Sequence, residues 1–222
     1  MEPGGRRRGA RSPQPGEASV SKGGAATSPG RFARAPAQVR IIGGQWKRTP
    51  LPVTHAPGLR PSPDRVRVTV FNWVAHFLPD LGSCSGLDLF AGTGALGFEF
   101  ASRGAARVVL VERQPQLLGL LRDQQAKLAA TQVEIVAGEA LTVAAGLPRA
   151  SFDVVFLDPP FGAGLLWPAI DAVRPLLADG GLVYAEADEP IEPADAAAHG
   201  LDILRRSRAG RVCFHLLQLR NA

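Results

Sequence analysis

Long hydrophobic runs and cysteines are the clearest absences from this 222-residue sequence. No apolar stretch approaches the ~20 residues that a helix needs to span a bilayer, and the N-terminus lacks the apolar core of a secretory signal. The two cysteines, Cys84 and Cys213, lie far apart in the chain and fit no metal-binding or redox spacing. We therefore expect a cytoplasmic protein with plain thiols, no metal and no membrane partner.

Acidic residues are scarce in the first third of the chain. Residues 1–70 hold 13 lysines and arginines against 3 aspartates and glutamates, a net charge of +10, whereas residues 71–222 carry a net charge of −5. Such segregation is typical of a protein that binds a polyanion. Residues 1–37 are rich in Gly, Pro, Ser and Arg, which predicts a disordered basic tail. For that tail alone, a purely solubilising role is an equally good interpretation.

Residues 38–80 are predicted to form a short addition in front of the main domain. The stretch VRIIGGQWKRTPLPV consists of two extended pieces around paired glycines, which predicts a hairpin. The stretch LRPSPDRVRVTVFNWVAHFL predicts a helix capped by Ser62, with Pro63 in its first turn. Its apolar residues share one face, which leaves Arg65 and Arg67 pointing elsewhere.

Strand and helix patterns alternate over residues 81–222, the main domain. This alternation predicts a doubly wound α/β fold with a mostly parallel seven-stranded sheet and an antiparallel C-terminal edge. The expected strands cover 86–90, 106–112, 133–138, 152–158 and 181–187, followed by two between 201 and 219 that turn at Ala209-Gly210. The expected helices cover 95–103, 115–130 and 165–177.

The stretch DLFAGTGALG, residues 88–97, places a G-x-G-x-x-G pattern between a strand and a helix. Glycines there permit a tight turn and let a ligand approach the backbone closely. Glu112 ends the next strand, where a carboxylate can bind a ribose diol. These features suit NAD and S-adenosylmethionine equally. Asp88 favours the latter, because an anion repels a pyrophosphate but suits the cationic amino acid end of the methyl donor.

The stretch FDVVFLDPPFG ends a buried strand with an acid, two prolines and an aromatic ring. The Asp158 carboxylate and the Pro159 carbonyl can accept hydrogen bonds from an exocyclic amine and so localise its lone pair for methyl transfer. The prolines keep this corner rigid, and Phe161 can stack on a base taken out of its helix. The alternative interpretation is a turn that merely stops a strand.

Together these motifs resemble the amino-methylating class I S-adenosylmethionine-dependent methyltransferases. RIIGGQWKRTPLPV, GLRPSPDRVRVTVFNWV and RAGRV narrow the resemblance to bacterial 16S ribosomal RNA guanine-N2 methyltransferases of the RsmD type, over residues 39–219. The resemblance implies a Rossmann-like fold, S-adenosylmethionine as methyl donor and methylation of a guanine N2 amine in small-subunit ribosomal RNA. It also favours the assembled small subunit as partner, and we expect a monomer.

The resemblance also implies roles for individual residues. Those expected to bind the donor are Asp88, Phe90, Ala91, Gly92, Gly94, Glu112 and Glu139. Those expected to handle the guanine amine are Asp158, Pro159 and Phe161. Those expected to face the RNA are Lys47, Arg48, Arg60, Asp64, Arg65 and Arg67.

Two positions depart from the family pattern: Val68 stands where glutamate is common, and Arg208 where lysine is common. These departures bear on the substrate rather than on the chemistry. Three other functions stay open. They are a DNA amino-methyltransferase acting on adenine N6 or cytosine N4, a methyltransferase acting on a protein glutamine, and a nicotinamide-dependent oxidoreductase.

Overall fold

The computed structural model describes the chain except residues 2–37, 54–61 and 221–222. The predicted basic tail therefore lies outside the described residues, as does Arg60. None of the helices in the described parts of the chain is long and apolar enough to cross a membrane.

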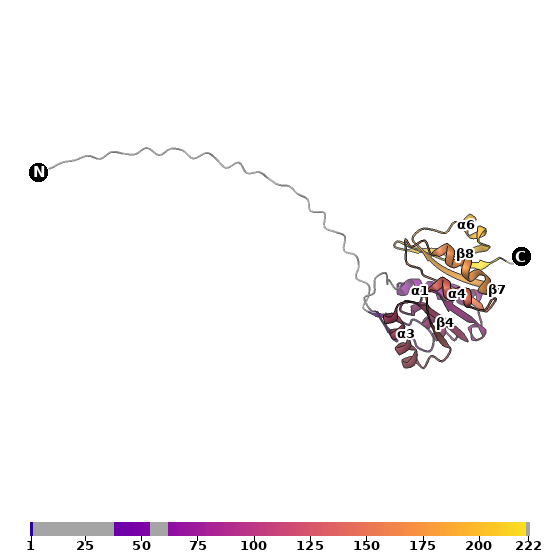
Figure 1. Cartoon of the computed structure of the whole chain (residues 1–222), viewed down its shortest axis with the longest axis horizontal. Helices are drawn as coiled ribbons and strands as arrows, with labels where there is room; N and C mark the ends of the chain where they lie inside the picture. The colour runs from indigo at the N-terminus through magenta and orange to yellow at the C-terminus, as the bar shows by residue number, and fades with distance from the viewer. Residues whose placement is uncertain (2–37, 54–61, 221–222) are drawn as a thin grey trace. The chain divides into compact units, whose positions relative to one another are not determined.

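A seven-stranded sheet forms the centre of the fold (Figure 1). Its strands are β3 (Ser85–Asp88), β4 (Arg107–Glu112), β5 (Val133–Ala137), β6 (Phe152–Leu157), β7 (Leu177–Ala187), β8 (Leu201–Ala209) and β9 (Val212–Leu219). They lie in the order β5-β4-β3-β6-β7-β9-β8. Strand β9 pairs antiparallel with both β7 and β8, and the other neighbouring strands pair parallel. The predicted mostly parallel sheet with an antiparallel C-terminal edge is confirmed.

Helices cover both faces of the sheet. They are α1 (Asp64–Phe77), α2 (Ala95–Ser102), α3 (Pro115–Leu128), α4 (Ala140–Gly146), α5 (Leu166–Val173) and α6 (Pro193–Ala198), with 3₁₀ turns η1 (Leu81–Ser83) and η2 (Arg174–Leu176). Buried residues of α1, α2 and α3 belong to one hydrophobic cluster, and those of α4, α5 and α6 to another. Side chains along β6 alternate between the two clusters, as expected for a strand buried on both faces.

The N-terminal addition shares the core of the main sheet. Its hairpin pairs β1 (Gln38–Arg40) with β2 (Pro50–Pro52), which confirms the predicted hairpin. The apolar residues of this hairpin, Val39, Ile41 and Leu51, are buried in the cluster that also holds α1 and α2. The hairpin and α1 are therefore fixed relative to the sheet by a common hydrophobic core.

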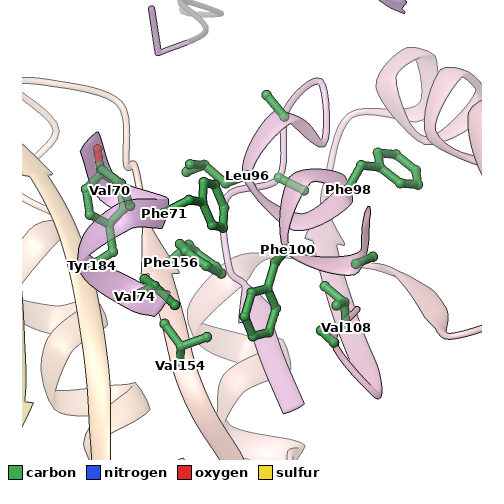
Figure 2. Close-up of a cluster of buried hydrophobic side chains, with 14 of the residues drawn as sticks. Val70, Phe71, Val74, Leu96, Phe98, Phe100, Val108, Val154, Phe156 and Tyr184 are labelled. Carbon is green, nitrogen blue, oxygen red and sulfur yellow. The ribbon is translucent and has the colours of Figure 1, made fainter. Parts of the chain in front are cut away.

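Aromatic side chains from both helices meet on β6. Figure 2 shows Phe71 of α1 and Phe100 of α2 next to Phe156, and each ring centroid lies 5.6 Å from that of Phe156. The ring of Tyr184, from β7, lies 6.2 Å from Phe156 on the same face of the sheet. This packing holds the start of α1 near the residues that follow β6.

A buried ion pair completes the attachment of the addition. The guanidinium of Arg67 donates to the backbone carbonyls of Arg40 at 2.9 Å and Ser62 at 3.3 Å, and it pairs with Asp64 at 2.8 Å and with Glu99 at 3.7 Å. Burial lowers the pKa of Arg67, although the two neighbouring carboxylates oppose this effect. The side chain is fully buried. The expectation that Arg67 faces RNA phosphates is therefore wrong, because its charge is used inside the protein.

The partner of this arginine is equally constrained. The carboxylate of Glu99, on α2, accepts hydrogen bonds from the backbone N–H groups of Ile42 at 2.6 Å and Gly43 at 2.8 Å, and from Arg103 at 2.8 Å. A buried charge with several donors is well compensated. Glu99 of α2 thus holds the hairpin region through backbone N–H groups, while Arg67 of α1 holds it through the backbone carbonyl of Arg40.

Candidate active site

A cavity of about 310 Å³ opens at the carboxyl ends of β3, β4 and β6. In open α/β sheets, ligands bind in this position. The described residues that line it include those of the glycine-rich turn, the ends of β4, β5 and β7, the DPPF stretch, the β8–β9 turn and the residues just before α1. Its expected functional residues are Asp88, Phe90, Ala91, Gly92, Glu112, Glu139, Asp158, Pro159 and Phe161.

Asp88 provides a buried carboxylate in this cavity. One oxygen, Oδ2, accepts a hydrogen bond of 2.9 Å from the backbone N–H of Gly97, while Oδ1 has no hydrogen-bond partner among the described residues. A Cβ at position 97 would lie 2.0 Å from a methyl group of Leu110, so glycine lets α2 approach the sheet without displacing that side chain. Burial, with a smaller contribution from the charge of Glu112, raises the pKa of Asp88 to about 7.

Glu112 is oriented by the backbone around the glycine-rich turn. Its Oε2 accepts from the N–H of Gly92 at 2.9 Å, and its Oε1 accepts from the N–H groups of Arg113 and Gln114, each at 2.8 Å. Three backbone donors therefore fix a carboxylate at the cavity wall. Gly94 does not line the cavity. It takes a left-handed φ of 75° at the N-cap of α2 and packs within the core instead.

Glu139 lines the cavity but also caps a helix. Its Oε2 accepts hydrogen bonds from the backbone N–H of Thr142 at 2.9 Å and from the hydroxyl of the same residue at 3.1 Å. These bonds at the first turn of α4 lower the pKa of Glu139. Glu139 thus lies in the cavity wall, while its carboxylate is occupied by the first turn of α4.

The acid and the ring of the DPPF stretch both reach the cavity. Asp158 is half-buried, and Phe161 is 40% exposed, which is unusual for a phenylalanine that follows a core strand. Burial, followed by the charges of Glu186 and Asp88, raises the pKa of Asp158. Neither side chain is sealed in the interior, so both are accessible to a ligand.

Two residues that sequence reasoning did not assign to the site complete it. The hydroxyl of Ser62 contacts a carboxylate oxygen of Glu186 at very short range and Oδ2 of Asp158 at 3.4 Å. The hydroxyl of Tyr184 donates to the same oxygen of Glu186 at 2.7 Å. Ser62 therefore does not cap α1, as expected from the sequence; the N-cap position is that of Pro63. The only sequence signal for Glu186 is an acid inside the otherwise apolar strand GLVYAEA.

The remaining residues expected to face RNA divide into two groups. Lys47, Arg48 and Arg65 are exposed. Asp64 is half-exposed and forms ion pairs with Arg67 and, at 3.4 Å, with Arg40, so its carboxylate has a structural role.

The β8–β9 hairpin adds arginines that the sequence analysis did not assign to RNA. Its turn reaches the cavity, because Ala209 and Val212 belong to the lining. Four exposed arginines lie on this hairpin: Arg208 and Arg211 next to its turn, and Arg205 and Arg206 further along β8. Within the described residues, none of the four forms an ion pair with a carboxylate. The mouth of the cavity is thus basic on the side of this hairpin.

The family model described as Conserved hypothetical protein 95 matches residues 39–218 of the chain. The chain belongs to this family. The names of its relatives confirm the methyltransferase resemblance drawn from the motifs, and the solved structures that it resembles show the fold of the class I methyltransferases.

Relatives within this family carry more specific names. The chain is 41% identical over 189 residues to the Ribosomal RNA small subunit methyltransferase D of Escherichia coli K12, covering 82% of this chain and 90% of the relative. It is 35% identical over 191 residues to the protein of the same name from Haemophilus influenzae, covering 83% and 95%. Among solved structures, the Putative methyltransferase yhhF from Escherichia coli superimposes with a TM-score of 0.71 at 40% identity, covering 83% of this chain and 99% of that chain.

Proposed function

We propose that this protein transfers a methyl group from S-adenosylmethionine to the exocyclic N2 amine of a guanine in 16S ribosomal RNA. The observation that carries the proposal is the cavity that brings the glycine-rich turn and the DPPF stretch together. The names of the relatives at 41% and 35% identity support the RNA substrate. We further propose that the protein acts in the cytoplasm as a monomer on RNA within the assembled small subunit.

The donor side of the cavity fits S-adenosylmethionine. The unpartnered Oδ1 of Asp88 is a buried acceptor that a cationic ammonium group would satisfy. Glu112, held by three backbone donors, presents a carboxylate for the ribose hydroxyls. When bound, the donor supplies an electrophilic methyl carbon. Asp88 and Glu112 would hold it at the carboxyl end of the sheet, and neither residue takes part in the bond change.

The acceptor side of the cavity fits a flat base with an exocyclic amine. The amine is a weak nucleophile because its lone pair is delocalised into the ring. The Asp158 carboxylate and the Pro159 carbonyl would each accept a hydrogen bond from one of its N–H groups. These two hydrogen bonds would localise the lone pair on the nitrogen. Phe161 would stack on the base, a contact worth roughly 1–3 kcal/mol. Because Pro159 and Pro160 hold the corner rigid, little reorganisation is needed during transfer.

Basic side chains on the surface would position the RNA around this cavity. Lys47, Arg48 and Arg65 of the addition are exposed, as are the four arginines of the β8–β9 hairpin. Such groups bind phosphates and fix the register of a nucleic acid without reading its sequence.

The proposal is tested by incubating the purified protein with radiolabelled S-adenosylmethionine and one of three acceptors: small ribosomal subunits, naked 16S RNA or duplex DNA. We expect label in the ribosomal acceptors and, after digestion, in N2-methylguanine. Label that enters only DNA would replace this function with that of a DNA amino-methyltransferase. Tight calorimetric binding of NAD without binding of S-adenosylhomocysteine would instead indicate an oxidoreductase.

A further inference from the structure

We propose that Ser62 and Glu186 are positioning residues that exchange one proton with Asp158, so that Asp158 becomes a free hydrogen-bond acceptor when the guanine amine arrives. This inference rests on the proposed function. It assigns a role to two residues outside the glycine-rich turn and the DPPF stretch.

The hydrogen-bond geometry places the hydroxyl of Ser62 between two carboxyl groups. The hydroxyl of Ser62 has one hydrogen, yet its oxygen contacts carboxylate oxygens of both Glu186 and Asp158. One hydrogen can serve only one of these contacts. We direct the Ser62 hydrogen to Glu186, which also accepts from Tyr184. A hydrogen carried by Asp158 would then complete the contact between Ser62 and Asp158.

The surroundings favour one negative charge shared by two carboxyl groups. Glu186 is only 3% exposed, and burial raises its pKa, while burial and then the charge of Glu186 raise the pKa of Asp158. Among the residues that the structure describes, the other ionisable groups that act on the pair are Asp88 on β3 and Tyr184 on β7. Asp88 adds repulsion, and burial raises the pKa of Tyr184, which keeps its hydroxyl neutral.

The position of Ser62 between the two acids is fixed from the other side. The guanidinium of Arg67, buried on α1, donates to the backbone carbonyl of Ser62 at 3.3 Å. The hydroxyl therefore has a defined place at the cavity wall, where Asp158 and Glu186 also lie.

The exchange conserves protons and charge. In the free protein, Asp158 carries the proton on Oδ2 and donates to the Ser62 oxygen, whose own hydrogen points to Oε1 of Glu186. When an amine takes its place beside Asp158, the Oδ2–H bond breaks and the proton passes to the Ser62 oxygen. The former Ser62 hydrogen passes to Oε1 of Glu186. Asp158 is left as a carboxylate that accepts from the amine, and Glu186 is neutral.

The pH dependence of the methylation rate tests this exchange. We expect Ser62→Ala to move the acid limb of the kcat profile to higher pH by about one unit or more, because the hydroxyl of Ser62 lowers the pKa of both Asp158 and Glu186 by hydrogen bonding; one unit is about a tenfold rate loss on the acid side. Ser62→Thr retains a hydroxyl and should keep the limb of the unmodified protein. Glu186→Gln should not raise the limb, because removal of the neighbouring negative charge lowers the pKa of Asp158.

A measurement on the free protein supplies an independent readout. Carboxyl NMR titration should show Asp158 titrating in two coupled steps in the unmodified protein and in one step at lower pH in Glu186→Gln. Binding of S-adenosylhomocysteine, followed by calorimetry, verifies that each variant is folded. Equal loss of rate at every pH in Ser62→Ala, or a single uncoupled step for Asp158 in the unmodified protein, would overturn the exchange. If the unmodified protein methylates no RNA, the proposed function fails, whereas the NMR result still decides the proton sharing.

Discussion

At the scale of single residues, the acid at the end of β6 is the most informative position. The Asp158 side chain reaches the cavity beside Ser62 and Glu186 rather than closing a turn on itself. Its proposed partner is the base and not the methyl donor. Loss of this carboxylate should therefore affect the reaction and leave donor binding intact.

We expect Asp158→Ala to lower kcat by roughly 10²–10⁴-fold, the usual contribution of a positioned hydrogen-bonding acid or base. The affinity for S-adenosylhomocysteine, measured by calorimetry, should change less than about threefold, since ΔΔG for a lost indirect contact is a fraction of 1 kcal/mol. Asp123→Ala, an exposed acid on α3, serves as the matched control and should leave both quantities unchanged. Full turnover by Asp158→Ala would show that this acid only shapes the turn after β6.

We expect Asp88 to make donor binding dependent on pH. Its pKa lies near 7 in the free protein because of burial. The ammonium group of the ligand would bind the ionised form, so the affinity for S-adenosylhomocysteine should rise as the pH rises through 7 and fall about tenfold per unit below it. Calorimetry from about pH 5.5 to 8.5 measures the slope of log affinity against pH, because this range extends roughly one unit or more to each side of the pKa. Asp88→Asn should bind weakly at every pH, and an equal slope in that variant would assign the titration to another group.

At the scale of secondary-structure elements, the attachment of the hairpin to α2 shows where sequence reasoning reaches its limit. Helical periodicity places Val66, Val70 and Val74 on the apolar face correctly, because they are buried. It places Arg67 outside, since a charged residue is seldom buried without a partner. That partner, Glu99, lies on a different helix 32 positions away, and nothing local in the sequence links the two.

The same limit applies to short elements. The long alternating segments predicted the seven main strands and helices α1, α2, α3 and α5. Helices α4 and α6, with seven and six residues, are too short to show a period and were not predicted. Strand β7 begins at Leu177, four residues before the predicted start at residue 181. The contact of Ser62 with Glu186 joins residues 124 positions apart, and only the folded sheet brings them together.

The buried ion pair predicts a large stability effect. We expect Arg67→Met to lower the free energy of unfolding by about 3 kcal/mol, because it leaves Glu99 buried without this countercharge. Arg65→Met, on the exposed side of the same helix, is the matched control and should change stability by less than about 0.5 kcal/mol. Urea unfolding followed by circular dichroism measures both. Equal stability of the two variants would show that Arg103 and the backbone donors suffice for Glu99.

At the scale of the whole molecule, exposed arginines lie next to the cavity that we propose as the site of methyl transfer to RNA. The glycine-rich turn and the DPPF stretch lie at the carboxyl ends of neighbouring strands, so the sheet order alone brings the donor site and the acceptor site together. The sequence predicted this arrangement because parallel strands end at one edge. It did not assign the arginines around the β8–β9 turn to RNA, since their relation to the cavity depends on the antiparallel return of β9 beside β7.

These arginines should contribute to RNA affinity through phosphates. We expect the double variant Arg208→Ala and Arg211→Ala to weaken binding to small-subunit RNA and to reduce the slope of log K against log salt by roughly 0.7–0.9 for each lost phosphate contact. Arg122→Ala, an exposed arginine on α3, is the matched control and should change neither quantity. Filter binding at several salt concentrations gives the slopes.

The same double variant should leave kcat at saturating RNA within about threefold of the unmodified value. The two side chains lie beside the mouth of the cavity rather than within it, and uniform binding affects KM and not kcat. An unchanged salt slope in the double variant would indicate that the RNA instead binds the other basic surface, which consists of Lys47, Arg48 and Arg65.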